Sequence, residues 1–103
     1  MTTDISLIID VLRQDLKVAE NAINENNFGF VGVIGNRIMS NLLADESKTK
    51  EFMLIGWILK DISGELETVK RLKDSNKLTN STKTAKEYLE KIGTMLSKKN
   101  VWQ

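Results

Sequence analysis

The predicted fold of this chain depends on the structure assigned to residues 26–41, NNFGFVGVIGNRIMSN. The glycines of this stretch, Gly29, Gly32 and Gly35, lie three residues apart among large apolar residues. A dinucleotide-binding loop needs G-x-G-x-x-G after a strand, and a P-loop needs Gly-Lys-Ser or Gly-Lys-Thr. The spacing G-x-x-G-x-x-G matches neither motif, so the stretch is predicted to be a helix or a strand.

Residues that follow the glycines favour the helix. At 100° per residue, Val31, Ile34 and Ile38 share one helical face, and Gly32 and Gly35 lie on or beside it. Each glycine costs roughly 0.8–1 kcal/mol relative to alanine inside a helix, so a compensating contact is expected. We predict that a neighbouring helix backbone packs closely against these two glycines. The alternative is a strand, which aromatic and β-branched residues favour but which has no evident partner.

Three other segments repeat apolar residues in steps of three and four, as amphipathic helices do. They run from Ile5 to Ile23, from Phe52 to Val69 and from Ala85 to Leu96, and the polar segment 74–80 is the clearest break. The sequence therefore predicts a single all-α domain, residues 1–103, folded as an antiparallel up-down four-helix bundle. The helices are expected near residues 4–25, 28–44, 48–74 and 82–98.

The composition excludes several kinds of chemistry. The 103 residues include no cysteine and no histidine, which excludes disulfides, zinc–thiolate sites and histidine-dependent catalytic arrangements. No metal, no cofactor and no enzymatic activity are expected. The longest apolar run, residues 52–59, is far shorter than the roughly 20 residues that span a bilayer, and the N-terminal residues do not resemble a signal peptide. A cytoplasmic protein is expected.

Asp15 occupies an unusual position, because it falls within the apolar arc of the first helix, where a carboxylate requires a partner. If the first two helices are antiparallel, Arg37 lies at about the same height. We expect a structural ion pair between them. The alternative is a ligand pocket formed by the polar residues of this region, which are Asp15, Asn36, Arg37, Ser40 and Asn41.

Four large apolar residues are predicted to point away from the core. Met53 and Trp57 fall opposite the apolar stripe of the third helix, and Phe30 and Val33 face away from that of the second. Clustered apolar groups on a surface mark interfaces, so a homodimer interface is predicted here. The alternative is that the fourth helix or the C-terminal residues cover them. In both cases residues 52–59 are expected to be buried on nearly all sides.

Basic residues gather in the second half of the chain, at Lys70, Arg71, Lys73, Lys77, Lys83 and Lys86. A nucleic-acid site would combine them with stacking residues, and only Tyr88 is nearby. A solvated helix face is the preferred interpretation. The sequence therefore predicts a small non-enzymatic helical protein that acts through protein–protein contacts, as an adaptor or regulatory subunit, and forms a homodimer. Nucleic-acid binding is the alternative.

Overall fold

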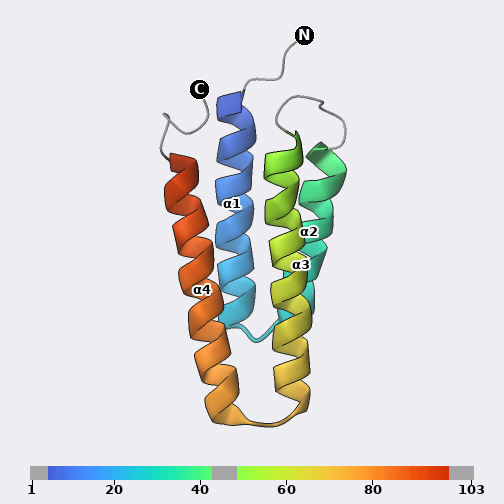
Figure 1. Ribbon diagram of the computed structural model, residues 1–103, viewed down its shortest axis with the longest axis vertical. Helices are drawn as coiled ribbons and strands as arrows, with labels where there is room; N and C mark the ends of the chain where they lie inside the picture. The colour runs from blue at the N-terminus through green and yellow to red at the C-terminus, as the bar shows by residue number, and fades with distance from the viewer. Residues whose placement is uncertain (1–4, 43–48, 98–103) are drawn as a thin grey trace.

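The part of the chain that the structure describes folds into four helices (Figure 1). The computed structural model describes residues 5–42 and 49–97. They form α1 (Ile5–Asn24), α2 (Phe28–Leu42), α3 (Thr49–Arg71) and α4 (Ser75–Ser97). Successive helices run in opposite directions, and each packs mainly against its two neighbours in a ring. The predicted all-α antiparallel bundle is confirmed.

The turn between α1 and α2 is a Schellman motif. Asn26 adopts a φ of 60°, in the left-handed region that asparagine tolerates better than most residues. Its N–H donates to the Ile23 carbonyl at 3.0 Å, and the Asn27 N–H donates to the Ala22 carbonyl at 2.8 Å. These bonds satisfy carbonyls at the end of α1 and reverse the chain within three residues.

The close approach of a helix backbone predicted for the α2 glycines is confirmed at Gly35, whereas Gly32 faces a side chain of α3. Residues 28–42 are one helix, so the alternative of a strand is wrong. A Cβ built on Gly35 would lie 2.6 Å from the Gly56 carbonyl oxygen, and one on Gly32 would lie 3.0 Å from Ser63 Oγ. The Ser63 hydroxyl donates to the carbonyl of Phe28 at 2.7 Å. Glycine is therefore needed where the backbones of α2 and α3 approach each other.

The start of α4 differs from the prediction. The helix begins at Ser75 rather than near residue 82, so the linker predicted over residues 74–80 is wrong. Asp74 is the N-cap, and its Oδ1 accepts the Lys77 N–H at 3.0 Å. The polar residues after it favour caps and turns, but inside α4 they bond back to the helix. The Thr79 hydroxyl, for example, donates to the Ser75 carbonyl at 2.9 Å.

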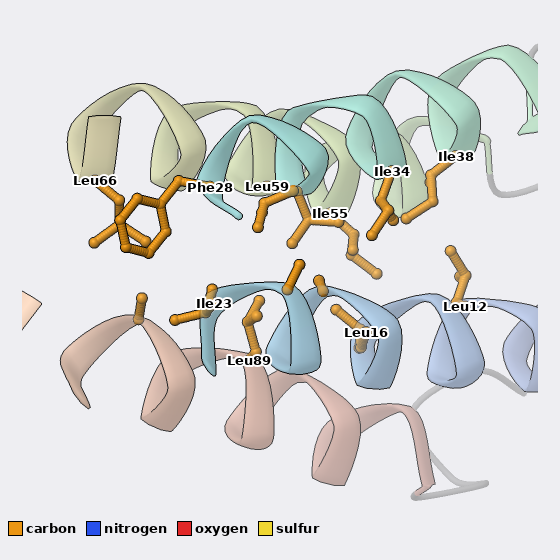
Figure 2. Close-up of a cluster of buried hydrophobic side chains, with 14 of the residues drawn as sticks. Leu12, Leu16, Ile23, Phe28, Ile34, Ile38, Ile55, Leu59, Leu66 and Leu89 are labelled. Atoms are coloured by element: carbon orange, nitrogen blue, oxygen red, sulfur yellow. The ribbon is translucent and has the colours of Figure 1, made fainter. Parts of the chain in front are cut away.

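The core lies between two layers, α2 with α3 on one side and α1 with α4 on the other (Figure 2). Figure 2 shows Ile34, Ile55 and Leu59 pointing toward Leu16 and Leu89 of the opposite layer. Burying a side chain of this size contributes roughly 1.5–3 kcal/mol relative to leaving it exposed. The apolar stripes identified in the sequence therefore hold the bundle together.

Candidate protein-contact surfaces

An ion pair joins α1 to α2. Arg37 Nη2 donates to Asp15 Oδ1 at 2.5 Å, so the pair predicted from the sequence is present in the structure. The Asp15 side chain is 9% exposed, whereas that of Arg37 is 50% exposed. The guanidinium therefore neutralises a buried carboxylate while it still reaches water.

The alternative ligand pocket around this pair is not assembled by the side chains that the structure describes. Asn36 and Ser40 are exposed. The side chain of Asn41 lies outside the described part of the chain. The structure thus brings together two of the five predicted pocket residues, Asp15 and Arg37.

The ion pair shows which sides of α1 and α2 face each other. Phe30 precedes Arg37 by two helical turns and therefore lies on the same side of α2. Val11 and Val18 flank Asp15 by about one turn on α1, on the side that faces α2. We define the α1–α2 face by its exposed apolar residues, whose exposed fractions are 44% for Val11, 38% for Val18, 39% for Phe30 and 56% for Val33.

Charged residues are nearly absent from α2. Arg37 is the one charged residue of Phe28–Leu42, and Asp15 neutralises it. The other outward-facing described side chains of α2 are apolar, as at Val33, or uncharged and polar, as at Asn36. Cores of protein interfaces are depleted in most charged residues and enriched in aromatic residues and arginine. The α1–α2 face is thus the strongest candidate contact surface among the described residues.

The third helix corrects two predictions. Met53 is half-buried and packs against the core, so its predicted outward position is wrong. It lies one turn before Gly56, whose Cβ would contact Met39 and the Gly35 carbonyl of α2. Leu54 and Trp57 are 60% and 50% exposed, so the expected burial of residues 52–59 on nearly all sides is also wrong. The Lys60 ammonium lies 4.9 Å from the centre of the Trp57 ring.

A groove that the sequence did not reveal lies between α3 and α4, with a volume of about 370 Å³. Its apolar lining comes from Ile58, Ile62, Leu66, Ala85 and Tyr88. Ile58 and Tyr88 flank the core stripes of their helices, and this position is the feature of the sequence that could have indicated the groove. Whether such flanking residues meet or leave a groove depends on the separation of α3 and α4, which the sequence pattern does not determine.

The polar lining of the α3–α4 groove is acidic. Asp61 and Glu65 lie one turn apart on α3, and α4 contributes the uncharged residues Asn80, Ser81 and Thr84. No lysine or arginine is among the residues that line this groove. The groove therefore combines an apolar floor with two carboxylates.

A second cavity, of about 380 Å³, lies between α1 and α4 and carries charges of both signs. Arg13, Lys17, Glu20 and Glu90 are part of its lining. Burial raises the pKa of the Glu20 carboxyl above its usual 4.5, and the nearby Glu90 raises it further, while Lys17 opposes the shift. The mixture of charges distinguishes this surface from the α3–α4 groove.

The predicted basic residues are spread over the ends of α3 and α4 and along α4. The ends of these two helices extend past the α1–α2 turn (Figure 1). Lys70 lies with its ammonium 5.8 Å from the centre of the Phe28 ring, and Lys86 donates to Asn24 Oδ1 at 2.8 Å. The remaining members, Arg71, Lys73, Lys77 and Lys83, are exposed.

Over residues 5–42 and 49–97, no helix has the length and apolar character needed to cross a membrane. Within the same residues, no group of three or more acidic, histidine or cysteine side chains gathers as a metal site would require. Comparison of the chain with family models, with curated proteins and with solved structures gives no match.

Proposed function

We propose that this is a small non-enzymatic cytoplasmic protein that acts through protein–protein contacts, as an adaptor or regulatory subunit. Two copies associate through the α1–α2 face. The observation that carries the proposal is α2 itself, a helix of 15 residues with one charged residue whose charge is neutralised within the chain. A helix exposed to water on its outer side normally carries charged residues there.

A second copy suits the α1–α2 face better than a charged partner does. Arg37 is neutralised by Asp15, so two such faces meet without like-charge repulsion. A two-fold dimer places the same patch on both sides of the contact and is the commonest form of homo-oligomer. The 15 residues of α2 span about 22 Å, which gives an elongated strip for such a contact.

Light scattering coupled to size-exclusion chromatography tests this proposal. The wild-type chain, of 11.7 kDa, is expected to elute with twice that mass at micromolar concentration. Val33→Glu places a charge on the α1–α2 face and is expected to give a folded monomer, because Val33 is 56% exposed. Leu72→Glu is the matched control, since Leu72 is similarly exposed but lies at the α3–α4 turn. A monomeric wild type, or equal dissociation by both variants, would contradict the proposal.

Nucleic-acid binding is the second candidate function. It is supported by Lys70, Arg71, Lys73 and Lys77, which lie close in sequence around the α3–α4 turn. Such binding is expected to weaken steeply with added salt, because neutralised phosphates release counterions. Salt-dependent retention on heparin that Lys73→Glu with Lys77→Glu abolishes would favour this candidate.

A further inference from the structure

We infer that the α3–α4 groove binds an amphipathic helix of a partner protein, one that carries an apolar stripe and a lysine or arginine about one turn beyond it. This site is separate from the α1–α2 face, and the inference does not require that the protein dimerises. The groove is thus a second contact surface, for a partner whose chemistry differs from that of a copy of the chain.

The apolar part of the groove explains why the partner helix should carry an apolar stripe. Ile58, Ile62 and Tyr88 line it, and Tyr88 is 48% exposed. In antiparallel α3 and α4, Leu54 lies one turn beyond Ile58, and Met95 lies two turns beyond Tyr88 toward the same end. Leu54 and Met95 are 60% and 52% exposed, so apolar surface continues past the groove. From Leu54 to Glu65 the surface extends about 17 Å, or three helical turns.

The carboxylates account for the charge of the partner. Asp61 and Glu65 belong to the lining, and no basic residue of the lining opposes them. An apolar helix that covered these carboxylates without a cation would bury charges at a cost. A lysine or arginine on the docked helix, placed over the last turn of the groove, neutralises them and fixes the direction in which the helix binds.

The walls of the groove favour a partner segment that binds as a helix over one that binds in an extended conformation. Both walls are α-helices whose backbone groups bond within the helix, so they offer no sheet edge to which an extended peptide could add. A helix satisfies its own backbone and contributes only side chains. Its residues at i, i+4 and i+7 can then contact Ile58, Ile62 and Tyr88.

The test is a titration of the full-length, ¹⁵N-labelled chain with a synthetic amphipathic helical peptide of about 16 residues, with leucines at i, i+4 and i+7 and lysines in its last turn. A second peptide has glutamates in place of the lysines. Amide shifts are expected to cluster at residues 54–66 and 80–95. Asp61→Lys with Glu65→Lys is expected to weaken binding of the lysine peptide by about tenfold and to strengthen binding of the glutamate peptide.

Asp10→Lys with Glu25→Lys is the matched control, because it makes the same change in net charge at exposed residues of α1 and the α1–α2 turn, neither of which lines the groove. It is expected to leave both affinities within about twofold. Shifts centred on the α1–α2 face, no binding, or equal effects of the two charge reversals would overturn the inference. If the lysine peptide does not bind and Tyr88→Ala halves the mass of the wild-type particle, a second copy occupies the groove instead. Repeating the peptide titration with the Val33→Glu variant shows whether the groove binds the peptide when association through the α1–α2 face is disrupted. Groove binding is therefore tested separately from the proposed dimer.

Discussion

Gly35 is the residue at which one added methyl group has the clearest consequence. Its Cβ would lie 2.6 Å from the Gly56 carbonyl oxygen and 3.2 Å from the Leu59 Cβ. We expect Gly35→Ala to destabilise the fold by about 1–3 kcal/mol despite the higher helix propensity of alanine, because α2 and α3 must separate. Gly64→Ala is the control, since no atom lies within 4 Å of its Cβ, and it is expected to stabilise by about 1 kcal/mol. Thermal denaturation measures both, and a raised midpoint for Gly35→Ala would contradict the packing described.

The Asp15–Arg37 pair is expected to behave asymmetrically. Arg37→Ala leaves a carboxylate that is 9% exposed without its cation, whereas Asp15→Ala leaves a guanidinium that already reaches water. Arg37→Ala should therefore cost more, about 1–3 kcal/mol, and the double variant should cost less than the sum of the two. Chemical denaturation of the four proteins gives the coupling energy. Strict additivity would show that the pair contributes nothing to stability.

Single residues also show how far the sequence could predict the sites. The pairing of Asp15 with Arg37 is predictable because the short connection near Asn26 makes α1 and α2 antiparallel, which places both residues at one height. The stripe of its own helix alone places Met53 on the surface. Its packing against the core depends on how the helices meet, which the pattern of one helix does not determine.

The start of α4 depends on its cap. Asp74→Ala removes the side-chain acceptor for the Lys77 N–H and is expected to cost about 1 kcal/mol. Asp74→Ser, which keeps an acceptor, should retain most of the stability. Hydrogen exchange is the sensitive measurement, because the amides of the first turns of α4 should lose protection before those of the core. Unchanged protection in Asp74→Ala would show that α4 starts independently of this cap.

The same helix shows why its presence could be predicted from the sequence and its first residue could not. The apolar repeat from Ala85 to Leu96 identified α4, since burial of that stripe determines that a helix forms. Residues 75–82 have almost no apolar repeat, and serine, asparagine and threonine there favour caps and turns in isolation. The Asp74 cap starts α4 ahead of them, and within the helix the Thr79 hydroxyl bonds to the Ser75 carbonyl.

The exposed apolar surfaces lie on two separate sides of the bundle. Each helix packs against two neighbours, so the α1–α2 face and the α3–α4 groove lie on opposite sides of the bundle. The α1–α4 side between them carries charges of both signs. The bundle therefore presents one neutral apolar surface and one acidic apolar groove on opposite sides, and the proposed adaptor role assigns a copy of the chain to the first and a partner helix to the second.

The most direct test of association through the α1–α2 face is a distance measurement across the assembly. The chain has no cysteine, so Asn36→Cys introduces a single site for a spin label on the exposed side of α2. Packed helices lie about 8–10 Å apart, and the two copies of α2 would face each other across the contact. Pulsed electron paramagnetic resonance should therefore give one distance between the two labels, below about 30 Å. A label at Leu72→Cys, beyond the contact, should give a longer distance. Absence of dipolar coupling at Asn36→Cys, or a shorter distance at Leu72→Cys, would contradict the account.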